Sequence, residues 1–143
     1  VRMVIARYAG TDARGRPFLI TAESAMQDSE DENLVHLDRM QADLTFDGNV
    51  WLSALAPVGL YDTDKQTLDL SGGADVYSNK GYEMHSPQVH LDLKNDFATG
   101  DHGVRGHGSL GRMSADSFRF ENDKQHLTLV GRVHVTYLPG FHR

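Results

Sequence analysis

A sequence pattern about as long as a β-strand recurs in this chain about every thirty residues. Each copy opens on a small residue and closes six positions later on an acidic one, as in Ala22 and Asp28, Ala56 and Asp62, Ser86 and Asp92, and Ala115 and Glu121. Three copies are followed by an apolar run that ends at or beside glycine, within residues 68–72, 97–100 and 127–131. Such a repeat is typical of stacked supersecondary units rather than of a domain built around one elaborated pocket. The sequence therefore predicts a ladder of strands with an open end.

The apolar residues alternate with a period of two. The clearest examples are the runs that begin at Phe18, Val89 and Val133, where every second side chain is apolar. Because successive side chains of a strand point to opposite faces, each run has one apolar and one mostly polar face. Residues 33–42 are the stretch most compatible with a helix, but they are few and fit a strand edge equally well. We expect an all-β protein.

Composition limits the classes of function. The 143 residues suit a single domain over 1–143, and a hydrophobic content of 39% with 14 glycines favours a thin or open core. The net charge is -6 and the basic residues are scattered, so the basic stripe of a nucleic-acid-binding protein is absent from the sequence. There is no cysteine, which excludes disulfides and thiol catalysis.

Turn signals separate the apolar runs. The Asp47–Gly48 dipeptide predicts a hairpin turn. Residues 100–111 contain five glycines, which predicts bulges or tight bends within the ladder. A phosphate-binding loop is disfavoured there because the Lys-Ser/Thr ending and the following helix are missing.

Eight histidines raise the question of a metal site. His85 and His90 are five residues apart, as are His102 and His107, and neither spacing places two imidazoles on one strand face. Solvent-facing histidines are the simpler interpretation, so no metal or cofactor is predicted. A site assembled by tertiary folding stays open.

Catalysis is not indicated by the remaining polar residues. Ser109 stands in a Gly-Ser-Leu-Gly run that lacks the spacing of a nucleophile elbow. The acids of the repeat close strands at regular intervals, as solvated turn formers do. We therefore expect a protein that is not an enzyme.

The apolar strand residues allow two interpretations. They form either an ordinary sandwich core or an elongated apolar trough that accepts a long hydrocarbon guest. The residues alone leave both open.

Three segments carry a resemblance to a known family. Residues 6–22 contain an aromatic residue, a glycine and an acid, followed by Gly-x-Pro-aromatic and an alternating strand that ends in Ala22. Residues 106–115 form a glycine-rich entry into a late strand, and residues 127–137 form two closing strands. Their order and spacing resemble the periplasmic domain of the LptC family of lipopolysaccharide export proteins, over nearly the entire chain.

The resemblance implies a twisted, boat-shaped β-jellyroll of two facing antiparallel sheets, with about fifteen or sixteen short strands. It also implies a periplasmic domain held at the bacterial inner membrane by an N-terminal helix that precedes this chain. The implied partners are lipopolysaccharide, an inner-membrane ABC transporter and an LptA-like periplasmic bridge protein. The alternatives are an LptA-like soluble bridge component and a structural β-repeat module without lipid.

With this resemblance, candidate site residues can be assigned. Acyl chains are expected to lie on apolar side chains between the sheets: Phe18, Ile20, Leu70, Met84, Val89, Leu91, Phe118, Phe120, Leu129 and Val133. The bridge protein is expected to pair with the C-terminal edge through Gly131, Val133, Val135 and Tyr137. The same edges would also allow edge-to-edge self-association.

Overall fold

The structure is a computed structural model that describes residues 2–46, 49–109, 111–121 and 126–137. Its regular structure is antiparallel strand, and none of these residues forms an α-helix. The strands are β1 (Arg2–Thr11), β2 (Pro17–Gln27), β3 (Leu34–Phe46), β4 (Val50–Asp62), β5 (Thr67–Ser78), β6 (Glu83–Asp92), β7 (Phe97–Gly100), β8 (Val104–Gly108), β9 (Gly111–Ala115), β10 (Ser117–Glu121), β11 (His126–Val130) and β12 (His134–Tyr137). The all-β class is confirmed, and residues 33–42 belong to β3 and the turn before it. The turn predicted at Asp47–Gly48 lies outside the described residues.

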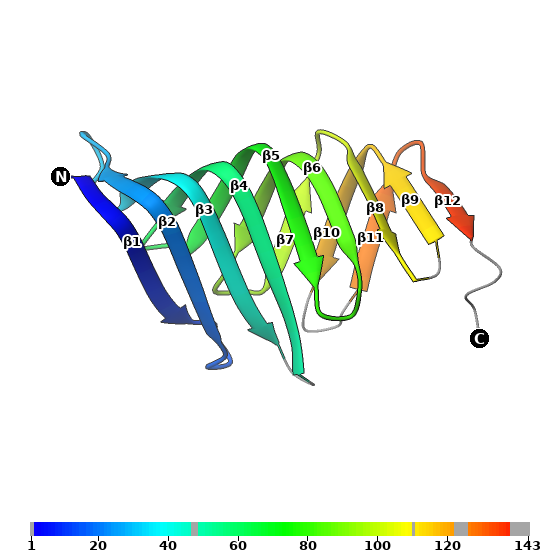
Figure 1. Cartoon of the computed structure of the whole chain (residues 1–143), viewed down its shortest axis with the longest axis horizontal. Coiled ribbons are helices and arrows are strands. Elements are labelled where there is room, and N and C mark those ends of the chain that lie inside the picture. Colours follow the sequence, from blue (N-terminus) through cyan, green and yellow to red (C-terminus); the bar gives the residue numbers. More distant parts are fainter. Residues whose placement is uncertain (1, 47–48, 110, 122–125, 138–143) are drawn as a thin grey trace.

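All twelve strands belong to one sheet that branches once (Figure 1). β1 to β6 pair in sequence order, so the first half of the chain is a simple meander. β6 then has two partners on one side, because its first half pairs with β8 and its second half with β7. The sheet continues from β7 to β10 and β11, and from β8 to β9 and β12. Among the described residues, the unpaired edges of the sheet are therefore β1 at one end and β11 and β12 at the other.

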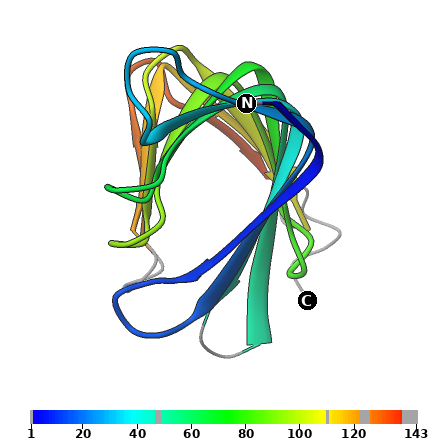
Figure 2. The same ribbon diagram turned by 90° about the vertical axis from the view of Figure 1, so that its left-hand side faces the viewer.

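Each long strand bends near its middle, so that the sheet folds over and forms two walls (Figure 2). Wall 1 contains residues 6–11, 17–22, 40–46, 50–56, 74–78, 83–86, 104–108, 111–115 and 134–137. Wall 2 contains residues 2–4, 24–27, 34–38, 58–62, 67–71, 88–92, 97–100, 117–121 and 126–130. The buried apolar residues of both walls form one core cluster.

The bends explain why fewer strands are found than expected. β1 to β6 each run through both walls as one strand, whereas later in the chain the bend interrupts the ladder at residues 101–103, 116 and 131–133. β9 and β10, for example, are two halves of one bent segment. Counted by wall, the described residues form eighteen strand segments, slightly more than the expected fifteen or sixteen.

The sequence repeat corresponds to this geometry. The small residues that open its copies, Ala22, Ala56, Ser86 and Ala115, are all buried beside a bend. The acids that close the first three copies cap turns, because a carboxylate oxygen accepts the backbone N–H groups of the following residues. The N–H donors are Glu30 and Asp31 for Asp28, Asp64 and Lys65 for Asp62, and Asn95 for Asp92. The expectation that these acids act as turn formers is confirmed.

Hydrogen bonds link successive bends in the glycine-rich part of the chain. The Ser86 hydroxyl donates to the carbonyl of Gly103 at 2.7 Å. The Gly103 N–H donates to Asp116, and the Asp116 N–H donates to Gly131, both at 2.8 Å. Gly103 and Gly131 have φ angles of 92° and 79°, which favour glycine. The prediction of tight bends in residues 100–111 is confirmed at Gly103.

A buried ionic contact joins the turn after β1 to the turn after β6. The Arg16 guanidinium donates to Asp12 at 2.7 Å and to Asp96 at 2.6 Å, and the three side chains are only 4–11% exposed. Beside it, the Ala13 N–H donates to the Lys94 carbonyl at 3.0 Å. Asp12 and Arg16 belong to the end of wall 1, and Asp96 to the end of wall 2. We call Asp12, Arg16 and Asp96 the latch, because they tie the free ends of the two walls together.

The two carboxyl groups of the latch titrate differently. Burial and contact with Asp12 raise the pKa of Asp96 to about 6. For Asp12, burial opposes ionisation, but hydrogen bonds from the backbone and guanidinium of Arg16 outweigh it and lower the pKa. Asp12 therefore stays ionised, whereas Asp96 takes up a proton as the pH falls through about 6.

Replacing Arg16 with alanine should destabilise the fold by about 3 kcal/mol, because it leaves two buried carboxyl groups without their cation. The matched control is Arg39→Ala, whose ion pair with Glu23 spans 3.3 Å and is 79% and 62% exposed. That change should cost no more than about 0.5 kcal/mol. Urea unfolding of both variants measures the difference, and equal losses would contradict a structural role for the latch.

Candidate functional site

Apolar side chains face each other across the space between the two walls. In wall 1, one cross-strand row comprises Ile20, Ala42, Ala54, Val76 and Met84, continued by Gly106, Met113 and Val135. In wall 2, the corresponding rows contain Leu37, Leu70, Val89, Phe118 and Leu129, and Val35, Tyr61, Leu68, Leu91, Phe120 and Leu127. We call this space the interior. It is apolar along the whole length of the ladder.

The interior is tightly packed over β1 to β6. Ile20, Leu37, Leu68 and Leu70 are at most 1% exposed. Tyr8 of wall 1 meets Tyr61 of wall 2 with ring centroids 5.5 Å apart, so these rings bridge the walls near the N-terminal end. Burial raises the pKa of the Tyr61 hydroxyl, which stays neutral. At this end the interior is a core rather than an open trough.

The interior becomes accessible toward the C-terminal end. Leu129 is only partly buried, Leu127 is 40% exposed and Val135 is 57% exposed, although all three continue the inward-facing rows. The cause is the topology, since β11 and β12 are the last strands of their walls. Side chains that would be covered by a further strand are exposed there instead.

The structure brings most of the predicted lipid-binding residues together. Six belong to the buried core cluster: Phe18, Ile20, Leu70, Val89, Leu91 and Phe118. Met84 and Leu129 pack against this cluster, and Phe120 is half-buried in the inward row of β10. Val133 differs, because it lies 45% exposed in the connection before β12. Sequence reasoning missed Tyr8, Leu37, Tyr61 and Leu68 of the interior, although Leu68 follows the same alternation as Leu70.

The predicted partner-binding residues all lie at the C-terminal edge. Gly131 and Val133 are in the connection between β11 and β12, and Val135 and Tyr137 are on β12. All four are exposed. A side chain at Gly131 would strain its φ of 79° and place a Cβ 2.6 Å from the Asp116 carboxylate, so a substitution there would also disturb the bend.

A groove lies on the outer face of wall 2. It has a volume of about 570 Å³, and its lining combines outward-facing residues such as His36, Asp69 and His90 with Leu70, Val89 and Phe118 of the inward row. His90 Nδ1 lies 2.5 Å from Asp69 Oδ1. The groove therefore opens on the outer face but is bounded in part by residues of the apolar interior.

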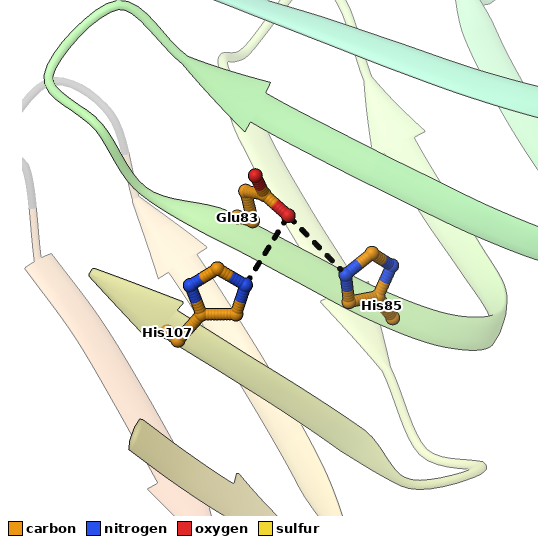
Figure 3. Close-up of side chains that lie close together, drawn as sticks. All are labelled: Glu83, His85 and His107. Atoms are coloured by element: carbon orange, nitrogen blue, oxygen red, sulfur yellow. Dashed lines mark ion pairs between the residues drawn. The ribbon is translucent and has the colours of Figure 1, made fainter. Parts of the chain in front are cut away.

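One cluster of titratable groups was missed by sequence reasoning. Glu83 and His85 on β6 and His107 on β8 converge on the outer face of wall 1 (Figure 3). Pairs of histidines gave no signal, but Glu83 and His85 have the i, i+2 spacing that places two ligands on one strand face. His107 could be added only with knowledge of the strand register.

No helix among the described residues is long and apolar enough to span a membrane.

Comparison with known proteins identifies the family of this chain. Among curated proteins, the search found no sequence that matches this chain. A family model described as "Lipopolysaccharide-assembly, LptC-related" matches residues 3–138, which is nearly the entire chain. The chain therefore belongs to the LptC-related family of lipopolysaccharide assembly, and its role is in lipopolysaccharide transport.

Proposed function

We propose that this domain is a non-enzymatic carrier that holds the acyl chains of lipopolysaccharide between its walls. It would receive the lipid from an inner-membrane ABC transporter and pass it to an LptA-like periplasmic bridge protein. The observation that carries the proposal is the set of inward-facing apolar rows in the two walls, buried near β1 and increasingly exposed toward β11 and β12.

The energetics suit a carrier. An acyl chain of about a dozen carbons gains on the order of 10 kcal/mol when it leaves water. The costs of association remove a large part of this gain. Because the interior is packed over β1 to β6, lipid contacts must also replace side-chain contacts there. Binding by exchange of apolar contacts is reversible, as hand-over requires.

The positions of the two edges suggest a direction. The N-terminal edge strand β1 is on the side tied by the latch and the Tyr8–Tyr61 contact, whereas the C-terminal edge exposes the interior. We assign the C-terminal edge to the bridge protein, whose strands would add to β11 or β12 and extend the apolar rows. The N-terminal edge, on the side of the implied membrane helix, is assigned to the transporter. Energy for one-way movement would come from the ATPase, since an apolar groove alone only equilibrates its cargo.

A photo-crosslinking residue at Phe120 or Leu129 should capture lipopolysaccharide, because both side chains face the interior near its accessible end. The matched controls are Arg119 and Thr128, the preceding residues on the same strands, which are exposed on the outer face. Crosslinked lipid is detected by immunoblotting. Capture confined to Arg119 and Thr128 would rule out the interior as the lipid site, and a domain that captures no lipid would favour the structural β-repeat alternative.

Val135→Glu should weaken bridge-protein binding by about tenfold or more, because a charge would be buried where apolar rows are to meet. Val58→Glu is the matched control, since Val58 is 45% exposed but lies on β4, which is paired on both sides. It should leave affinity unchanged. Circular dichroism checks that both variants fold, and biolayer interferometry measures binding. Equal affinities for the two variants would argue for another docking edge.

A further inference from the structure

Three side chains with metal-ligand chemistry meet on the outer face of wall 1, away from the interior (Figure 3). Glu83 Oε2 lies 3.2 Å from His107 Nε2 and 3.7 Å from His85 Nε2. All the ligand atoms lie within 4.8 Å of one another. Glu83 and His85 are half-buried, and His107 is exposed.

The strand register holds these groups in place. Glu83 and His85 are two residues apart on β6 and therefore share one face. Glu83 is also the direct cross-strand partner of His107 on β8. Each side chain thus projects from a paired strand rather than from a loop. The backbone position is fixed by strand pairing, and only the side-chain rotamer can vary.

A fourth residue orients one of the imidazoles. His85 Nδ1 lies 2.5 Å from Asp75 Oδ1, and Asp75 on β5 is the cross-strand partner of His85. With the proton on Nδ1 donated to Asp75, the Nε2 lone pair is directed toward Glu83. A carboxylate that fixes the second nitrogen of a histidine in this way is the usual support of a metal-binding histidine. The Tyr77 ring also stands edge-on to the His85 ring, at 6.4 Å between centroids.

The spacing suits a small transition-metal ion. Two ligand atoms bound tetrahedrally to Zn²⁺ at about 2.0–2.1 Å lie about 3.3–3.4 Å apart. The two contacts of Glu83 bracket this value. Two imidazole nitrogens and one carboxylate oxygen form a donor set typical of zinc, whereas calcium and magnesium require mainly oxygen ligands.

We propose that Glu83, His85 and His107 bind a divalent transition-metal ion, best matched by Zn²⁺, with Asp75 as the residue that positions His85. A fourth coordination position stays open to water. The two carboxylates supply a charge opposite to that of the ion. Two arginines are cross-strand partners of the histidines, Arg105 of His85 and Arg112 of His107. Their positive charges repel a cation, but both side chains are exposed and solvent screens this repulsion.

Metal binding would strengthen the point where the sheet branches. In the described part of the chain, three residue pairs attach β8 to β6, and two of them, Glu83 with His107 and His85 with Arg105, contain the ligands. β9 and β12 are attached to the rest of the sheet through β8. A bound ion would therefore clamp the C-terminal part of wall 1 to β6. This inference does not depend on the proposed lipid transport.

The experiment is a Zn²⁺ titration of the tag-free domain by isothermal calorimetry. The wild-type domain should bind a single ion at this site, and His85→Gln or His107→Gln should weaken binding at least about tenfold. Asp75→Asn should weaken it by about tenfold as well, through the orientation of His85. The matched control is His90→Gln, because His90 has the same contact with an aspartate but belongs to no group of three metal-ligating side chains among the described residues. It should bind Zn²⁺ as the wild type does.

Hydrogen exchange provides a second measurement that is independent of affinity. Zn²⁺ should slow amide exchange in β8 and β9 of the wild-type domain and of His90→Gln, but not of His107→Gln. Wild-type affinity in both His85→Gln and His107→Gln, or the absence of any Zn²⁺ binding by the wild-type domain, would overturn the proposal.

Discussion

The bend in the middle of every long strand is the constraint on which the rest of the structure depends. One sheet supplies both walls, so each strand must present apolar side chains inward before and after it turns over. Side chains of a strand alternate between its two faces. An extra residue at the bend shifts this alternation, so that apolar side chains point inward both before and after it. Inward positions shift from Leu37 to Met40 in β3, and from Ala56 to Gly59 in β4.

Different residues solve this local problem in different strands. Arg39 takes a φ of 48° at the bend of β3, and β5 uses Gly72 and Gly73, both with positive φ. β4 and β6 place Pro57 and Pro87 there, where a missing N–H interrupts the ladder at little cost. The small buried residues beside several bends let the two walls approach. Without this row of bends the chain would form a flat sheet with one apolar face in water.

The folded-over sheet gives the domain two unlike ends. The latch and the Tyr8–Tyr61 contact hold the walls together near β1, while the missing neighbours of β11 and β12 expose the interior at the other end. A lipid that enters a packed interior of this kind must separate side chains, so binding and opening of the walls are one event. The proposed clamp at Glu83, His85 and His107 would act on the part of wall 1 nearest the open end.

Local features were predictable from the sequence, and long-range ones were not. Alternation identified the strands and most of the interior, and the regular acids identified the turns, because both follow from neighbours in the chain. The latch joins Arg16 to Asp96 across eighty residues, and the metal-ligand cluster depends on the register of β6 with β5 and β8. Neither pairing leaves a mark in a single sequence. Val133 was assigned to the interior from its place in an alternating run and from the family resemblance, and it lies 45% exposed just before β12.

The most direct test of the account is the distance between the walls with and without lipid. The chain has no cysteine, so nitroxide labels at Arg112→Cys on wall 1 and Thr128→Cys on wall 2 report this distance cleanly by double electron–electron resonance. Lipopolysaccharide should shift the distance distribution to longer values, and its deacylated polysaccharide should not. An unchanged distribution in the presence of bound lipopolysaccharide would contradict an acyl-chain site between the walls.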